Sequence, residues 1–126
     1  MQVNKEIDYS LILIRALKDT YKSGEFVSLE TAAEDYNLPY SFLEKLAGKL
    51  KRAGILNSQK GKSGGYRLAL KPSMISVGKI MDVFQEKPAS KCGTCYLAET
   101  CPSISGLQKI DTAVRKTLNR LTVNNL

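Results

Sequence analysis

The sequence predicts a mostly α-helical fold with one small β-hairpin and a long helix at the C-terminal end. Three observations carry this prediction. Apolar residues recur at helical spacing through residues 4–21, 28–53 and 76–84. A glycine-rich turn at residues 60–65 separates two short segments of strand-like character. In the last segment, residues 103–126, apolar residues recur every three or four positions.

The composition is that of an ordinary globular chain of one domain. The 126 residues are 43% hydrophobic and 25% charged, which is enough to bury a core. No apolar run approaches the length of a membrane span and the first residues lack a signal-peptide core, so we expect a cytoplasmic protein without membrane contact. Three cysteines are an odd number, which suits a reduced compartment with metal chemistry better than a secreted disulfide framework.

The positive charge is concentrated in one quarter of the chain. Residues 39–71 hold eight basic residues and one acid, so this segment carries the whole net charge of +7. Clustering of this kind indicates an anionic partner, most often nucleic acid. A solvated basic face without a partner is the alternative.

The first predicted helix covers residues 4–21 and has one broad apolar face. Asp8 lies in its first turn, where a negative charge complements the helix dipole. That role alone is sufficient to explain Asp8, unless another part of the protein needs a ligand there. The apolar face contains Ile7, Leu11, Ile14 and Leu17.

Two further helices with a tight turn between them follow the first one. Ser28 is a candidate N-cap for a short helix that runs to Tyr36. Pro39 marks the turn. Ser41 and Glu44 have the spacing of a capping box, which predicts that the second helix begins at Ser41. Two short helices, a turn and a basic segment are the pattern of a helix-turn-helix.

The second of these helices has polar side chains on the face opposite its apolar stripe. In a helix-turn-helix this face enters the major groove of DNA. Lys45, Lys49 and Lys51 suit phosphates, whereas Ser41 and Glu44 suit base edges. A capping box would equally explain Glu44, and Tyr40 could simply pack as a staple at the start of the helix. The candidate DNA-binding residues of this helix are Tyr40, Ser41, Glu44, Lys45 and Lys51.

Residues 55–70 predict a β-hairpin with a basic, glycine-rich tip. A hairpin that directly follows a recognition helix is a wing, and a narrow basic tip fits the minor groove. An ordinary solvent-exposed turn is the alternative. Pro72 ends the hairpin, and Ser76 is a candidate N-cap for a fourth helix. The candidate DNA-binding residues of the wing are Lys60, Lys62 and Arg67.

All three cysteines lie in the segment 88–102, with the spacing C-x2-C-x5-C. This spacing brings Cys92, Cys95 and Cys101 close enough to hold one metal centre, and we interpret the segment as a metal-binding loop, most readily for an iron–sulfur cluster. Zinc competes, because three cysteines and one oxygen ligand make a tetrahedral site.

The last segment predicts a long helix with a narrow apolar seam. Such a helix suits a twofold dimer, which would pair two recognition helices on a palindromic site. The alternative is that the helix folds back on its own domain, and we expect some of both. Residues 123–126 are predicted to be a frayed end. The seam consists of Ile104, Leu107, Ile110, Val114, Leu118 and Leu121.

Taken together, these features resemble the Rrf2 family of winged helix-turn-helix transcriptional regulators, over nearly the whole chain. The resemblance lies in Asp8-Tyr9, in the segments 41–46 and 50–56, in the wing at 60–68 and in the three cysteines that precede a long helix. It implies a DNA-binding domain at 1–87 with the wing at about 55–70, a cluster-binding loop at 88–102 and a dimerisation helix at 103–126.

The resemblance also implies a homodimer that holds a [2Fe-2S] cluster in each subunit and senses redox state, nitric oxide or iron–sulfur status. Some members of the family complete the cluster with a histidine after the third cysteine, but this chain contains no histidine. In others, an acidic residue from the first helix of the partner subunit is the fourth ligand. Asp8 occupies the matching position, and Glu6 is the nearby substitute.

Other functions of the same residues remain open at this point. A regulator of the same fold could bind zinc, or could hold no metal and switch by pairing Cys92 or Cys95 with Cys101. An enzyme is not expected, because histidine, paired carboxylates and a phosphate-binding loop are all missing from the sequence. Steeply salt-dependent binding to double-stranded DNA would separate a regulator from a protein-interaction module.

Overall fold

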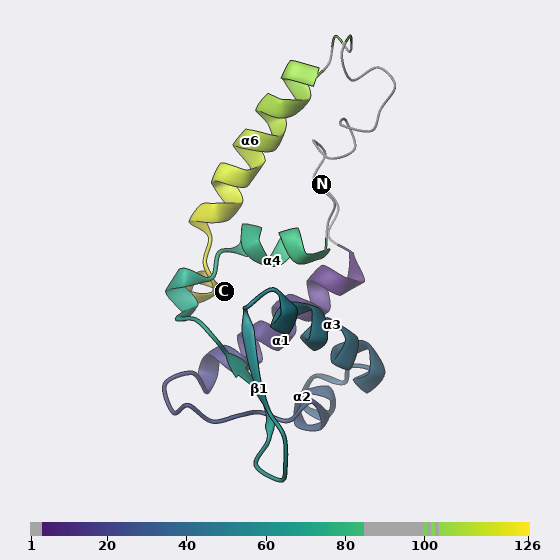
Figure 1. The fold of residues 1–126 in the computed structure, drawn as a ribbon, viewed down its shortest axis with the longest axis vertical. Coiled ribbons are helices and arrows are strands. Elements are labelled where there is room, and N and C mark those ends of the chain that lie inside the picture. The colour runs from purple at the N-terminus through teal and green to yellow at the C-terminus, as the bar shows by residue number, and fades with distance from the viewer. Residues whose placement is uncertain (1–3, 85–99, 101, 103) are drawn as a thin grey trace.

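The computed structural model of the protein describes residues 4–84, 100, 102 and 104–126 (Figure 1). Its described part is mostly helical with one two-stranded antiparallel sheet, which confirms the predicted fold class. The elements are α1 (Lys5–Asp19), α2 (Leu29–Tyr36), α3 (Tyr40–Arg52), β1 (Leu56–Gln59), β2 (Gly65–Leu68), the 3-10 turn η1 (Pro72–Met74), α4 (Val77–Phe84), α6 (Ile104–Arg120) and the 3-10 turn η2 (Val123–Asn125).

Polar side chains cap several of the helices. Asn4 accepts a hydrogen bond from the backbone N–H of Ile7 and so caps α1. Ser28 caps α2 and Ser76 caps α4 in the same way, as predicted. At its other end α2 stops at Asn37, whose φ of 53° is left-handed and turns the chain toward α3.

The predicted start of α3 is wrong by one residue. Pro39 is the N-cap, no side chain caps this end, and Tyr40 is the first helical residue. The Pro39 carbonyl accepts the first helical hydrogen bond from Leu43, at 3.1 Å. Because the helix starts before Ser41, this serine and Glu44 do not occupy the two positions that a capping box requires.

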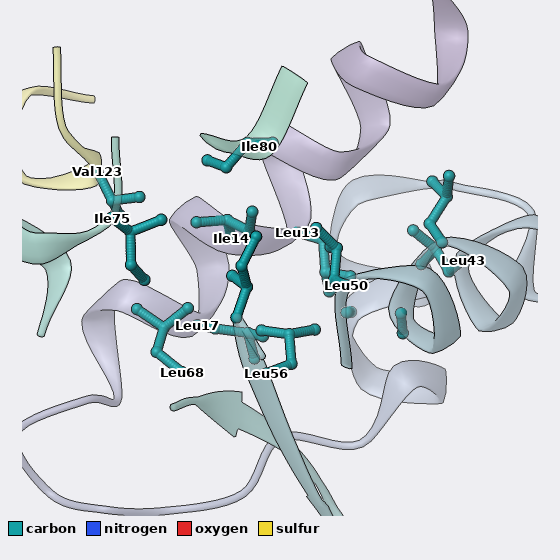
Figure 2. Packing of buried hydrophobic residues seen from close by; sticks show 14 of the residues in the cluster. Leu13, Ile14, Leu17, Leu43, Leu50, Leu56, Leu68, Ile75, Ile80 and Val123 are labelled. Atoms are coloured by element: carbon teal, nitrogen blue, oxygen red, sulfur yellow. The ribbon is translucent and has the colours of Figure 1, made fainter. Parts of the chain in front are cut away.

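One hydrophobic core joins the helices to the hairpin (Figure 2). Helix α1 lies at its centre and contributes Leu13, Ile14 and Leu17, each at most 1% exposed. Helix α3, the hairpin and α4 close around α1, which fixes the recognition helix relative to the wing. The core residues that these elements contribute include Leu43, Leu46, Leu50, Leu56, Leu68 and Ile80.

The hairpin is held by a third segment as well as by its own two strands. Strand β1 pairs with β2 in a register that sets Leu56 opposite Leu68. Val27 pairs with Tyr66 through two backbone hydrogen bonds of 2.9 and 2.8 Å. Gly65 has a φ of 148°, and a Cβ at this position would lie 2.2 Å from the Val27 carbonyl oxygen. Only glycine allows the segment before α2 to approach the wing this closely.

Val123 enters the core and residues 123–125 form a 3-10 turn, so the prediction of a frayed end is wrong. Val123 is fully buried, and its N–H donates to the Ile75 carbonyl at 2.9 Å. Thr122 and Asn125 form a capping box around η2. The Lys18 ammonium donates to the backbone carbonyls of Asn124 and Leu126, at 3.3 and 3.2 Å. The end of the chain therefore stabilises the body of the domain.

Helix α6 extends away from this body, and only its C-terminal part lies against α4 (Figure 1). Arg115 donates two hydrogen bonds of 2.8 Å to the carboxylate of Asp82 on α4. This hydrogen-bonded carboxylate raises the pKa of the Arg115 guanidinium above its usual value. Within the described residues, no helix is long and apolar enough to cross a membrane.

Candidate nucleic-acid interface and metal centre

Helix α3 has one buried face and one exposed face. Its buried residues, Leu43, Leu46, Ala47 and Leu50, are all fully covered. Tyr40, the first residue of the helix, is 44% exposed. The structure thus places the predicted major-groove residues on one continuous, solvent-facing side. Those exposed residues are Tyr40, Ser41, Glu44, Lys45 and Lys51.

The hairpin carries two of its three predicted contacts at the tip. Lys60 and Lys62 are exposed in the turn between β1 and β2. Gly61 has a φ of 109°, and its carbonyl accepts a hydrogen bond from Gly64 at 3.0 Å, so the tip is a tight turn. In Figure 1 the hairpin projects from the body, clear of α4 and α6. Both lysines are therefore exposed on the part of the hairpin that lies farthest from α4 and α6.

Arg67 lies in a different environment from the two lysines. It is half-buried on β2 and donates a hydrogen bond of 3.1 Å to the Gly24 carbonyl. Its guanidinium also lies over the ring of Phe26, 4.6 Å from the centroid. These contacts attach the wing to the segment before α2. The predicted contact of Arg67 with DNA stays a prediction, whereas its role in positioning the wing had no signal in the sequence.

Lys49 also has partners within the chain, although it is a lysine of the recognition helix. Its ammonium lies 3.0 Å from Oε1 of Glu6 on α1 and 5.6 Å from the ring centroid of Phe84 on α4. The side chains of Lys49 and Glu6 are 30% and 25% exposed. Sequence reasoning grouped Lys49 with the lysines that suit phosphates, and it gave no sign of this junction of three helices.

The candidate metal ligands fall in two different parts of the chain. Cys92, Cys95 and Cys101 lie outside the described residues. Asp8 lies in the first turn of α1, as predicted, where it is exposed and makes no ion pair with another described residue. Glu6, its nearby substitute, is already paired with Lys49. Of these two carboxylates, only Glu6 has an ion-pair partner among the described residues.

The chemistry of the donor set fits the expected group. Three thiolates and one carboxylate suit the iron of a [2Fe-2S] cluster, and they suit zinc equally. In the described ranges alone, no three side chains of the metal-binding types come together.

Comparison with known proteins agrees with this architecture. The family model Rrf2, described as an iron-dependent transcriptional regulator, matches residues 3–126. Over its full length the chain is 33% identical to slr0846 of Synechocystis sp., named as a candidate HTH-type transcriptional regulator, and covers 87% of that protein. It is also 30% identical over its full length to the regulator NsrR of Halalkalibacterium halodurans, of which it covers 90%.

The fold is similar to that of CymR, the global cysteine regulator of B. subtilis. The two structures agree with a TM-score of 0.78 and 26% sequence identity, over 99% of this chain and 95% of that one. A fold likeness of this extent includes the long last helix as well as the helix-turn-helix and the wing. The chain belongs to the Rrf2 family, a family of helix-turn-helix transcriptional regulators and not of enzymes.

Proposed function

We propose that the protein is a homodimeric regulator that binds a palindromic site on double-stranded DNA and adjusts its affinity through a [2Fe-2S] cluster. The observation that carries this proposal is the exposed polar face of α3 beside a basic wing, both within the segment that holds the entire net charge. The family membership supports transcriptional control as the outcome of that binding.

The proposed DNA contacts are of two kinds, base contacts from the first turns of α3 and phosphate contacts from the lysines of α3 and the wing. Ser41 and Glu44 lie in the N-terminal half of α3, where a recognition helix meets base edges in the major groove. Lys45 and Lys51 contact phosphates beside them, and Lys60 and Lys62 follow the backbone into the minor groove. This arrangement gives the lysines most of the affinity and the first turns of α3 most of the specificity.

The proposed dimer uses the part of α6 that the domain leaves uncovered. Leu107 is 42% exposed and Ile110 is 62% exposed, although both belong to the apolar seam. Leu118, eleven positions after Leu107, packs on Ile7, Val77 and Met81 of its own chain. A second copy of α6 is the partner that a seam of this type fits, and twofold pairing sets two α3 helices on one palindrome.

The proposed sensor consists of Cys92, Cys95 and Cys101 with Asp8 of the partner subunit. The bound cluster would supply a redox-active centre whose oxidation, nitrosylation or loss releases these ligands. A carboxylate ligand is more exchangeable than a thiolate, and one that comes from the partner makes ligand release change the subunit arrangement. The alternative is a regulator of the same fold with zinc or with no metal, in which the three thiols themselves are the sensor.

Two measurements test the proposal. Anaerobically purified protein should show visible charge-transfer bands with about two irons and two sulfides per chain. It should also bind a duplex enriched from a random DNA pool with a steep salt dependence, and lose or gain affinity when the cluster is removed. A colourless protein with one zinc would replace the cluster by the zinc alternative, and a metal-free protein would favour the thiol switch.

Substitution of the ligands sharpens the same test. Cys92→Ala should abolish the visible bands, and its DNA affinity should no longer respond to oxidant. Asp8→Asn should keep the bands but shift them and speed cluster loss, because one oxygen ligand is weakened. Asp19→Asn, at the far end of α1, removes an exposed carboxylate from the same helix and is the matched control. Bands that Asp8→Asn leaves unchanged would exclude Asp8 as a ligand.

A further inference from the structure

The cysteine segment lies between α4 and α6 in the sequence, and the structure joins these two helices to each other. Phe84 ends α4 eight residues before Cys92, and α6 begins at Ile104. The two hydrogen bonds from Arg115 to Asp82 fix α6 against α4. The helices on the two sides of the segment are therefore held to each other.

Helix α4 meets the recognition helix at one charged junction, formed by Lys49, Glu6 and Phe84. Lys49 extends from α3, forms an ion pair of 3.0 Å with Glu6 on α1, and holds its ammonium 5.6 Å from the ring centroid of Phe84. That separation is within the range of a cation–π contact. Phe84 also packs against the hydrophobic core. Lys49 of α3 thus contacts both α1, the helix that carries Asp8, and Phe84, the last residue of α4 before the cysteines.

The position of Lys49 on α3 separates it from the DNA-facing lysines. Lys45 and Lys51 are exposed, while Lys49 is partly covered and directed at a carboxylate. An ammonium that already has a carboxylate partner gains less from a phosphate, because it must first give up that pair. The geometry therefore gives Lys49 one partner on α1, which carries Asp8, and one on α4, which precedes the cysteines in the sequence.

We propose that Lys49 is a positioning residue that couples the cysteine segment to the recognition helix, by linking α3 to Phe84 and Glu6. This proposal rests on the proposed sensing function and adds the route by which the sensor acts. When the segment after Phe84 rearranges, the ring of Phe84 shifts relative to the Lys49 ammonium. Helix α3 then loses one of the contacts that fix its orientation, and its exposed face meets DNA less well.

The first test asks whether Lys49 contacts DNA, using a duplex of mixed sequence. Removing one phosphate contact lowers the slope of log affinity against log salt concentration by about 0.9. Lys45→Met should show this decrease. Lys49→Met, which keeps the length of the side chain but removes its charge, should leave the slope of the wild type unchanged. A decrease in Lys49→Met equal to that in Lys45→Met would make Lys49 a phosphate contact and overturn the proposal.

The second test measures coupling, as the ratio of affinities for the enriched duplex before and after the cysteine segment is oxidised or stripped of metal. Couplings of this kind span about 5- to 150-fold. In Lys49→Met the ratio should fall toward one, while Lys49→Arg, which preserves both contacts, should restore it. Phe84→Leu, which keeps an apolar side chain but removes the ring, should reduce the ratio as well. Lys79→Met, an exposed lysine of α4, should match the wild type.

The outcomes separate this proposal from the one on which it rests. A wild-type ratio of one would mean that the cysteine segment does not control DNA binding, and both proposals would fail. A normal wild-type ratio that persists in Lys49→Met and Phe84→Leu would overturn the coupling role alone. A ratio that collapses in both variants, with a wild-type salt slope in Lys49→Met, supports Lys49 as the link.

Discussion

The two ends of α6 carry the same apolar pattern but lie in different environments. Near the C-terminal end, Leu118 packs on α1 and α4, and Val123 beyond it is fully buried. Nearer the N-terminal end, Leu107 and Ile110 are exposed. One seam in the sequence therefore has two environments, which periodicity alone cannot distinguish: part of it completes the domain, and part of it is exposed.

The largest effect is expected where the end of the chain enters the core. Val123→Asp places an unpaired carboxylate in a fully buried position and should lower the free energy of unfolding by about 3–5 kcal/mol. Urea denaturation followed by circular dichroism measures this. Leu126→Asp, at a position that is 37% exposed, should change the stability by less than about 0.5 kcal/mol. A Val123→Asp effect as small as that of Leu126→Asp would show that Val123 does not anchor the end of the chain.

The exposed end of α6 should respond in the opposite way, with a loss of assembly and no loss of folding. Ile110→Asp should weaken the dimer by about 100-fold, or ~2.7 kcal/mol, because the charge would be buried between two copies of the helix. Sedimentation velocity measures the assembly, and circular dichroism confirms the fold. Thr112→Asp adds the same charge off the seam and should stay dimeric. A monomeric wild type would remove this part of α6 from the proposed interface.

The errors of sequence reasoning arose where a local pattern competed with contacts from distant residues. The order of the helices, the hairpin and the cap at Ser28 were predictable, because periodicity, turn glycines and caps are local signals. The capping box at Ser41 was a chance match of spacing, since Pro39 starts the helix earlier. The burial of Val123 could not be foreseen, because a single valine in a polar tail has no period.

The candidate site was predictable to different degrees in its three parts. The exposed face of α3 followed from its apolar stripe, and the lysines of the hairpin tip followed from the turn. The ion pair of Lys49 and the anchoring of Arg67 depend on Glu6 and Gly24, each 43 residues away in sequence, so no local pattern could reveal them. The roles of the three cysteines and the domain boundaries stay predictions.

A smaller effect is expected at the contact between α6 and α4. Arg115→Gln removes both hydrogen bonds to Asp82 and should cost about 1 kcal/mol, because the pair is partly exposed and solvent screens it. Thermal unfolding at low and high salt measures the cost, which should shrink as salt rises. Lys116→Gln, at the next and exposed position of α6, is the matched control. An Arg115→Gln effect that is unchanged at high salt would mean that packing, not charge, joins the two helices.

The smallest expected effect is that of a substitution at Gly48 in α3. This helix, like α6, has a buried part and an exposed part. Gly48 lies inside this helix, and a Cβ added there would have no neighbour within 4 Å. Glycine inside a helix costs roughly 0.5–1 kcal/mol relative to alanine, so Gly48→Ala should stabilise the free protein by about that amount. Nothing in the described chain requires glycine at this position. A surface that approaches α3 closely would require it, and DNA is that surface in our proposal.

Gly48→Ala should therefore raise the melting temperature and at the same time lower affinity for the enriched duplex by about fivefold, or ~1 kcal/mol. Gly54 provides the contrast, because a Cβ there also has no neighbour, yet its φ of 80° strains any other residue. Gly54→Ala should destabilise the protein where Gly48→Ala stabilises it. If Gly48→Ala gains stability without losing affinity, then α3 does not approach DNA along this part of its exposed face, and the contact must lie nearer its N-terminal end.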